Sequence, residues 1–135
     1  ENHERDFLTV GSMGHASQIA LGISLQKKER KVWCFDGDGA MIMHMGNLAI
    51  TASLSPKNFI HVLFNNGAHD SVGGQPTVGL DIDLCTIAKS VGYKQVFSIN
   101  TAKELNIVPP AGIALKISSI KFKFLLHENF CNYNP

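Results

Sequence analysis

Two short apolar runs, each closed by a polar turn, constrain the fold of this 135-residue chain most strongly. Residues 32–35 (VWCF) lead into residues 36–39 (DGDG), and residues 59–64 (FIHVLF) lead into residues 65–67 (NNG). A helical pattern over residues 41–54 separates the two runs. Two buried strands joined by one helix within about 35 residues are typical of a βαβ unit with parallel strands.

Further apolar runs and helix signals continue this alternation along the chain. We expect helices over residues 14–25 and 83–91 and one opening at residues 101–104, strands over residues 95–99 and 113–117, and a polar, glycine-rich loop over residues 65–79. Asp81 or Asp83 is the expected cap of the helix over residues 83–91, and Thr101 with Glu104 forms a capping-box pattern. The alternation predicts an α/β fold with a mostly parallel sheet and helices on both faces.

Composition and charge argue against several classes of partner. The chain has 12 Lys and Arg against 11 Asp and Glu, and the basic residues form no stripe, which argues against nucleic acid. No apolar run approaches the roughly 20 residues that a membrane span requires. Only 17% of the residues are charged, which suggests that a partner covers part of the surface.

The cysteines indicate the cellular compartment, and the first residues indicate whether the chain is part of a longer protein. Cys34, Cys85 and Cys131 show no CxxC spacing, which argues against a disulfide framework and a zinc site. Free thiols favour a reducing, cytoplasmic compartment. The chain opens at Glu1 with charged residues and no signal-peptide core, so we expect a fragment or one domain of a longer protein.

Polar residues gather where the two strands of the βαβ unit end. Ligands bind at these carboxyl ends in an open parallel sheet, and a glycine turn before a helix exposes N–H groups to a phosphate. Asp38 would repel a phosphate unless a cation lay between them, and Asn66 with a loop carbonyl could complete the ligands of that cation. Oxygen ligands favour Mg²⁺ or Ca²⁺. A Walker loop and a dinucleotide fingerprint are excluded, because no Lys follows Gly39 and Ile42 stands at the third glycine position.

The spacing of the two turns resembles a known cofactor signature. Residues 37–39 (GDG), followed after 25 residues by residues 65–66 (NN), match the signature of thiamine diphosphate-dependent decarboxylases and synthases. The segments GSMGHASQIALG, DGDGAMIMHMGNLA and NNGAHDSVGGQPT resemble the C-terminal domain of the phosphonopyruvate decarboxylases, with sulfopyruvate decarboxylases as close relatives. The resemblance implies a thiamine diphosphate-binding domain over residues 1–105 and leaves residues 106–135 as an unmatched C-terminal segment.

The resemblance also implies ligands for the metal and the cofactor. Mg²⁺ would be bound by two side chains and one carbonyl, those of Asp38, Asn66 and Ala68. The diphosphate would be bound by the loop and the helix start, at Gly37, Gly39 and Ala40. Met13 would be the apolar wedge that holds the cofactor bent, with a buried loop methionine as the alternative, and His15 could contact cofactor or substrate.

The glycine-rich loop carries the candidate catalytic pair. His69 and Ser71 lie just past the proposed metal ligands, beside Asp70, and a loop position favours function over packing. They could bind an anionic phosphonate or assist proton transfer, and a solvated turn is the alternative. His61, inside an apolar strand, is expected to be a core residue. His44, on the helix after the first turn, is expected either to pack in the fold or to support the residues that contact the cofactor.

The reaction that the resemblance implies is the decarboxylation of 3-phosphonopyruvate to phosphonoacetaldehyde and CO₂ with thiamine diphosphate and Mg²⁺. This chain would supply the diphosphate and metal half of the site. A glutamate on a pyrimidine-binding domain, usually from another subunit, would supply the other half. The complete enzyme would be a homo-oligomer and the isolated chain inactive. Two alternatives stay open: the diphosphate-binding subunit of a sulfopyruvate-type decarboxylase, and a truncated, non-catalytic fragment of the same fold.

Overall fold

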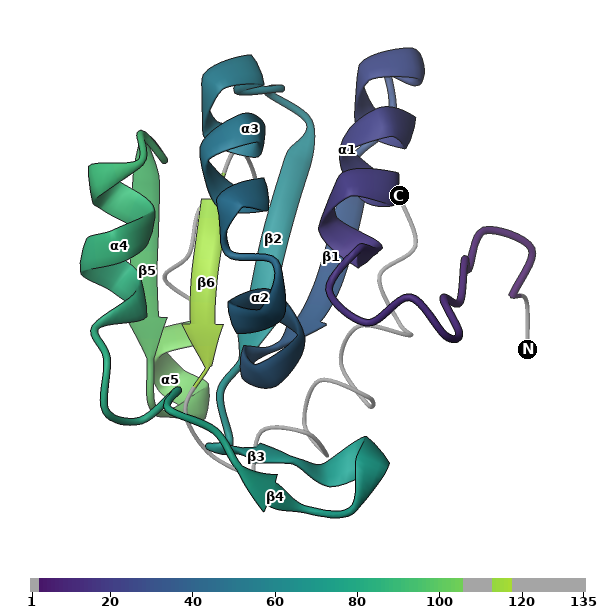
Figure 1. The fold of residues 1–135 in the computed structure, drawn as a ribbon. Helices are drawn as coiled ribbons and strands as arrows, with labels where there is room; N and C mark the ends of the chain where they lie inside the picture. The colour runs from purple at the N-terminus through teal and green to yellow at the C-terminus, as the bar shows by residue number, and fades with distance from the viewer. Residues whose placement is uncertain (1–2, 106–112, 118–135) are drawn as a thin grey trace.

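The computed structural model describes residues 3–105 and 113–117 (Figure 1). The strands are β1 (Val32–Gly37), β2 (Phe59–Phe64), β3 (Ala68–His69), β4 (Gln75–Pro76), β5 (Gln95–Ile99) and β6 (Ile113–Ile117). The helices are α1 (Ala16–Gln26), α2 (Asp38–Met43), α3 (Gly46–Leu54), α4 (Leu84–Ser90) and α5 (Ala102–Leu105), with a 3₁₀ turn, η1, at Asp70–Val72.

The main sheet has four described strands in the order β1-β2-β6-β5, and each neighbouring pair is parallel. β1 and β2 are paired in register up to Gly37 beside Phe64, so the two strands end level with one another. The residues that follow, Asp38 and Asn65, therefore lie at the same edge of the sheet. The predicted parallel βαβ unit is confirmed.

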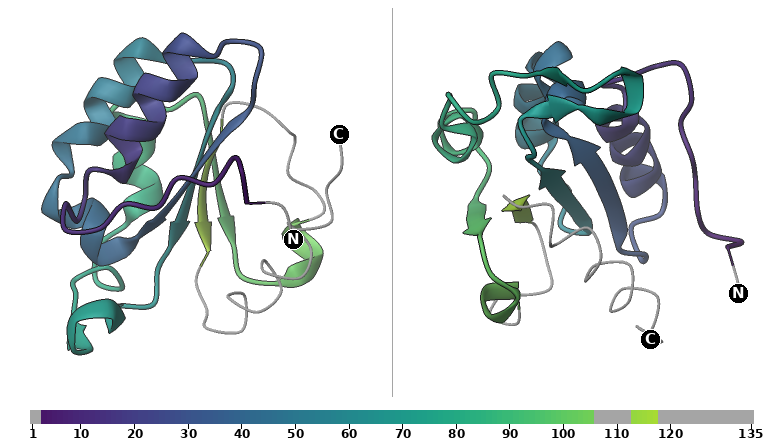
Figure 2. Two further views of the ribbon diagram at one scale, coloured as in Figure 1. Left: turned by 90° about the vertical axis from the view of Figure 1, so that its right-hand side faces the viewer. Right: turned by 90° about the horizontal axis from the view of Figure 1, so that it is seen from below.

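Helices lie on both faces of the sheet (Figure 2). α1, α3 and α4 cover one face, and α5 lies on the other (Figures 1 and 2). α1 packs on β1 and β2, whereas α4 packs on β5 and β6. The predicted fold class, a mostly parallel sheet between helices, is confirmed. None of the helices in the described part of the chain is long and apolar enough to cross a membrane.

The core lies between the sheet and the helices of the first face. β2 is buried from Phe59 to Val62, as expected for a strand with neighbours on both sides. One apolar cluster joins α1 to the sheet through Ala20, Cys34 and Phe59. A second joins α2, α3 and the start of α4 through Met41, Leu48 and Leu84. These clusters hold α1 and α2 against the strands whose ends carry the polar turns.

The helix predicted over residues 41–54 is in fact two helices. α2 ends at Met43, and His44 leaves the helical region with φ −131° and ψ 47°. The N–H groups of His44 and Leu48 bond to carbonyls three residues earlier, which tightens the backbone around the break. Gly46, which opens α3, is a weak helix former, and it was the local signal for this break.

The turn and the loop around the candidate site are also more ordered than predicted. Residues 36–39 form no separate loop, because β1 leads directly into α2 at Asp38. The loop predicted over residues 65–79 contains the antiparallel hairpin β3–β4. Gly73 and Gly74, at φ +119° and +76°, make the reversal of that hairpin possible.

The predicted caps are present with one difference. Asp83 caps α4, since its Oδ1 accepts the N–H groups of Cys85 and Thr86, both at 3.1 Å. The carboxylate of Glu104 accepts the N–H of Asn100 at 2.7 Å, one residue before the position that a capping box uses. Of the unmatched C-terminal segment, the strand at residues 113–117 is confirmed, and residues 106–112 and 118–135 lie outside the described residues.

Candidate functional site

The candidate site lies at the carboxyl ends of β1 and β2, beneath which the β3–β4 hairpin passes (Figure 1). α2 begins at Asp38, directly after β1, and packs against β1, β2 and β3. Asn65 directly follows β2. The fold thus assembles this site from two strand ends, one helix start and one hairpin.

Asp38 is the most buried charged residue of the site, with 1% of its surface exposed. Its Oδ2 accepts a hydrogen bond from the hydroxyl of Thr77, which reaches it from beyond the hairpin. Its Oδ1 is also buried and has no hydrogen-bond partner within residues 3–105 and 113–117. A buried carboxylate oxygen without a donor is costly unless a cation binds it.

Asn65 supplies a second unpartnered oxygen beside Asp38. It is 2% exposed, and its Nδ2 donates to the carbonyl of Gly79 at 2.5 Å. Its Oδ1 has no hydrogen-bond partner among the residues that the structure describes. A Cβ placed on Gly79 would overlap Oδ2 of Asp38 and lie 2.8 Å from Oδ1 of Asn65, so the two side chains converge at Gly79.

The carboxylate and amide oxygens that converge here suit a hard divalent cation. Mg²⁺ and Ca²⁺ prefer such ligands, and each would satisfy oxygens that otherwise lack a donor. Gly79 leaves room for this arrangement, because a side chain there would overlap Oδ2 of Asp38 and crowd Oδ1 of Asn65.

Asn66 and Ala68, the other predicted metal ligands, lie within the loop that follows. Oδ1 of Asn66 accepts the N–H of Ala68 at 3.1 Å, and its Nδ2 donates to Asp70 at 2.6 Å. The side chain of Asn66 is thus engaged inside the loop, whereas that of Asn65 faces Asp38.

Gly39 and His69, predicted to bind the diphosphate and the substrate, lie in contact. A Cβ on Gly39 would overlap Nδ1 and Cε1 of the His69 ring and would lie 3.1 Å from Cγ2 of Thr77. Gly37 has open space at the corresponding point, and Ala40 follows in the first turn of α2. The imidazole of His69 therefore lies against the start of α2, where the diphosphate was predicted to bind.

The turn that carries Met13 and His15 is packed beside the same helix. Gly14, at φ +87°, comes so close to His44 and to the carbonyl of Ala40 that a Cβ would meet them at 2.5–2.6 Å. Its carbonyl accepts Nδ2 of Asn47 from α3 at 3.0 Å. Met13 is half-buried there, so the structure brings it to the same region as Ala40.

The two histidines of this region pack on one another. The rings of His15 and His44 have their centroids 4.2 Å apart. Nδ1 of His44 is buried and has no hydrogen-bond partner within the described ranges. His15 occupies the N-cap position of α1 without a hydrogen bond from its side chain to the helix, and it is exposed.

Ser71 is exposed to solvent. It lies in the 3₁₀ turn η1, at the exposed tip of the β3–β4 hairpin. Asp70, beside it, is bound to Asn66. The structure thus brings His69 to the start of α2 and leaves Ser71 at the tip of the hairpin.

Three residues of the site were missed in the sequence: Asn65, Thr77 and Gly79. Asn65 could have been found, because equal positions after two paired parallel strands place it next to Asp38. Thr77 and Gly79 gave no signal, since their contacts depend on how the hairpin folds back over α2.

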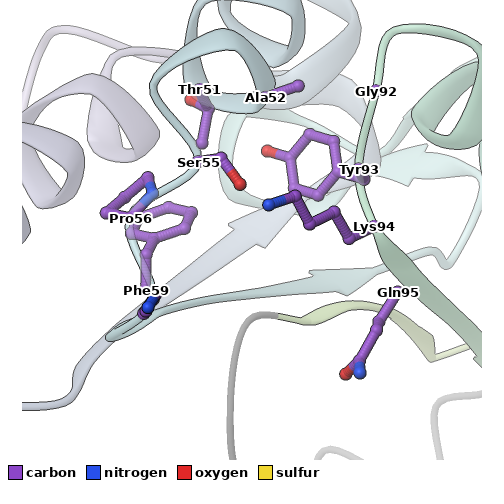
Figure 3. A pocket seen from close by; sticks show the side chains of 10 residues that line it. Thr51, Ala52, Ser55, Pro56, Phe59, Gly92, Tyr93, Lys94 and Gln95 are labelled. Carbon is purple, nitrogen blue, oxygen red and sulfur yellow. The ribbon is translucent and has the colours of Figure 1, made fainter.

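A cavity of about 340 Å³ lies at the other end of the strands, where β2 and β5 begin (Figure 3). Phe59 and Gln95, the first residues of β2 and β5, line it. Figure 3 shows Tyr93 projecting toward Thr51 and Ser55 on the helix side. This cavity is separate from the predicted cofactor site, which lies at the other ends of the strands.

Residues 2–114 match the protein family described as "Thiamine pyrophosphate enzyme, C-terminal TPP binding domain". Over 114 residues the chain is 35% identical to a phosphonopyruvate decarboxylase of Streptomyces hygroscopicus. The matched region covers 84% of this chain and 28% of that protein. Over 97 residues it is 42% identical to the sulfopyruvate decarboxylase subunit beta of Methanocaldococcus jannaschii, covering 71% of this chain and 51% of that subunit.

The fold is also similar to a solved structure, that of a thiamine diphosphate-dependent 4-hydroxybenzoylformate decarboxylase of Rhodococcus jostii RHA1. The TM-score is 0.64 at 16% identity, over 79% of this chain and 23% of that one, so the likeness concerns the fold alone. The chain spans between about a quarter and a half of the length of the two sequence relatives.

Proposed function

This chain belongs to the thiamine pyrophosphate enzyme family, as the C-terminal TPP-binding domain, and we propose on this premise that it supplies half of a 2-oxo acid decarboxylase site. The half is the one that binds Mg²⁺ and the diphosphate of thiamine diphosphate. One observation carries the proposal: two buried, unpartnered oxygens, on Asp38 and Asn65, lie beside the Gly-Asp-Gly turn. A bridging cation is the simplest way to satisfy both.

Asp38 is the anionic metal ligand in this proposal. Its Oδ2 is held by Thr77, which leaves Oδ1 for the cation. Asn66 and the carbonyl of Ala68 are the ligands that the family resemblance adds, and the local geometry adds Oδ1 of Asn65. Mg²⁺ commonly keeps waters and phosphate oxygens as its remaining ligands, so this small protein set is sufficient.

Gly37, Gly39 and Ala40 form the proposed diphosphate cradle. The absence of a side chain at Gly39 lets a group approach the backbone at the start of α2. Met13, half-buried beside Ala40, is the proposed apolar wedge for the cofactor, and His15 lies at the mouth of the same turn. When bound, the cofactor supplies the electron sink for loss of CO₂, and the chain supplies binding and orientation.

His69 is the proposed catalytic histidine of this half-site. Its ring lies against Gly39, within reach of any group bound at the start of α2. Nδ1, which faces Gly39, is the atom that would donate to a substrate anion or hold a proton. Ser71 is proposed to contact the same anion from the exposed tip of the hairpin, where it remains accessible to substrate.

The proposed substrate is 3-phosphonopyruvate, converted to phosphonoacetaldehyde and CO₂. The name of the Streptomyces relative supports this choice. The M. jannaschii relative supports a second candidate, sulfopyruvate, and a two-chain arrangement, since it is named as a subunit beta. Both substrates are 2-oxo acids with a second anionic group, which is the chemistry that a histidine and a serine can bind.

A pyrimidine-binding domain or subunit is the proposed partner, because the half-site needs a second wall and an activating glutamate. We expect a homo-oligomer when both domains are present. The test is an aldehyde-coupled assay of the chain with and without a pyrimidine-domain partner, on phosphonopyruvate and on sulfopyruvate. Turnover of either acid only with the partner supports the proposal. Turnover by the chain alone, or none with any partner, would contradict it.

A further inference from the structure

A buried polar cluster in the core lies apart from the proposed cofactor ligands. Cys34 and Asp36 stand two positions apart on β1, so both face the helices, and His61 is the register partner of Cys34 on β2. Their exposed fractions are 4%, 4% and 3%. Sγ of Cys34, a carboxylate oxygen of Asp36 and a ring nitrogen of His61 all lie within 4.8 Å of one another.

Tyr93 lies next to this cluster. Its hydroxyl oxygen is 3.3 Å from Nδ1 of His61. A neutral His61 that binds a metal through Nε2 would carry its proton on Nδ1 and donate it to Tyr93.

The other ring nitrogen of His61 faces a carboxylate. Nε2 of His61 lies 3.4 Å from Oδ2 of Asp36, which is longer than the roughly 2.7–2.9 Å of a charge-assisted hydrogen bond. A proton on Nε2 can bridge the two groups, and a metal ion can take the place of that proton. Ligand atoms about 2.0–2.2 Å from a tetrahedral zinc ion are themselves about 3.3–3.5 Å apart, which agrees with this separation.

We infer that Cys34, Asp36 and His61 form a binding site for a divalent transition metal of the zinc type. Zn²⁺ accepts a thiolate, a carboxylate and an imidazole together, whereas Mg²⁺ prefers oxygen ligands and disfavours the thiolate and the imidazole. A thiolate and a carboxylate together balance the two positive charges of the ion. Tyr93 is the outer partner that orients the ligating histidine, as carboxylates and carbonyls do in known metal sites.

The cavity at the amino ends of the strands approaches the cluster. Tyr93 and Phe59 line that cavity (Figure 3), and both also contact His61. Burial and the neighbouring Asp36 carboxylate raise the pKa of Cys34 to about 12.

The inference is independent of the decarboxylase proposal, and a spectroscopic titration tests it. The full chain is stripped with a chelator and titrated with Co²⁺, a visible substitute for Zn²⁺, in excess Mg²⁺ so that the oxygen-ligand site is occupied. We expect one equivalent to bind with a thiolate-to-cobalt charge-transfer band. Cys34→Ser should abolish the band, and Tyr93→Phe should weaken binding about ten- to a hundred-fold.

Control variants separate this cluster from the other cysteines. Cys85→Ser and Cys131→Ser should both retain the band, and loss of the band in either would overturn the assignment. If Cys34→Ser does not fold, X-ray absorption of the zinc-loaded chain decides. One sulfur at about 2.3 Å with nitrogen or oxygen neighbours at about 2.0–2.2 Å supports the site. Absence of saturable binding, or a spectrum with nitrogen and oxygen neighbours only, would overturn it.

Discussion

The hydroxyl of Thr77 donates a hydrogen bond to Oδ2 of Asp38, which lies 39 positions earlier in the chain. The N–H of Thr77 donates to the carbonyl of Gly67 at 2.9 Å, and its Oγ1 accepts the N–H of Gly79 at 3.1 Å. Thr77 thus connects the segment that follows the hairpin with the carboxylate that we propose binds Mg²⁺. One carboxylate oxygen is held in place, and the other remains available to the metal.

Thr77→Val removes this hydroxyl and nearly preserves the side-chain volume. A hydrogen bond to a charged group contributes about 1.5–3 kcal/mol, so Mg²⁺-dependent affinity for thiamine diphosphate should fall at least about ten-fold. Thr77→Ser, which keeps the hydroxyl, should lose far less. Calorimetric titration of both variants compares them, and equal affinities would show that the bond to Asp38 has no role in binding.

Gly39→Ala and Gly37→Ala form a matched pair within one motif. The added methyl at Gly39 would overlap His69 and crowd Thr77, whereas at Gly37 it meets nothing within 4 Å. Overpacking typically costs about 1–3 kcal/mol, so Gly39→Ala should lower the free energy of unfolding by this amount and impair cofactor binding. Gly37→Ala should be nearly as stable as the parent chain. Urea denaturation measures both, and a neutral Gly39→Ala would argue against the contact with His69.

The two adjacent asparagines can be distinguished by their alanine variants. Asn65→Ala removes the buried oxygen beside Asp38, so the affinity for Mn²⁺, used as a probe for Mg²⁺, should fall about ten-fold. Asn66→Ala removes a side chain that is engaged within the loop, so we expect an effect no larger than that. Electron paramagnetic resonance of Mn²⁺ counts the free ion. A loss confined to Asn66→Ala would assign the amide ligand to Asn66 and exclude Asn65.

Asp83→Ala tests the local account of α4. The Asp83 side chain accepts two backbone N–H groups and the hydroxyl of Thr86 at 2.6 Å. Loss of such a cap should lower the free energy of unfolding by about 1 kcal/mol. Asp81→Ala removes an exposed carboxylate nearby and should have little effect. If thermal denaturation gives the two variants equal midpoints, Asp83 does not cap the helix as described.

The strands and most helices could be predicted because their signals are local. The apolar run of β2 and the cap at Asp83 are properties of a few neighbouring residues, and both were found. The break at His44 had one weak local signal, Gly46, whereas the close approach of Gly14 to His44 involves a turn some thirty positions earlier. A contact between distant segments leaves little trace in either segment alone.

The residues proposed to bind the metal and the diphosphate could be predicted from the sequence. The residues that pack around them from beyond the hairpin could not. Asp38 and Gly39 were expected at a strand end, and the structure places them there with His69 alongside. Thr77 and Gly79 were missed because their contacts arise when the hairpin folds back over α2. The buried cluster of Cys34, Asp36 and His61 was also missed, since a search for paired cysteines does not detect a site with one cysteine.

Calorimetric titration of thiamine diphosphate into the assembled enzyme, with and without Mg²⁺, tests whether Asp38 binds the metal. Asp38 is the anionic ligand between metal and cofactor, so Asp38→Ala should abolish Mg²⁺-dependent binding. Glu29→Ala, which removes an exposed carboxylate in the turn before β1, should leave it unchanged. If Asp38→Ala binds thiamine diphosphate with the affinity of the parent enzyme, the assignment of the metal site to this strand end is wrong.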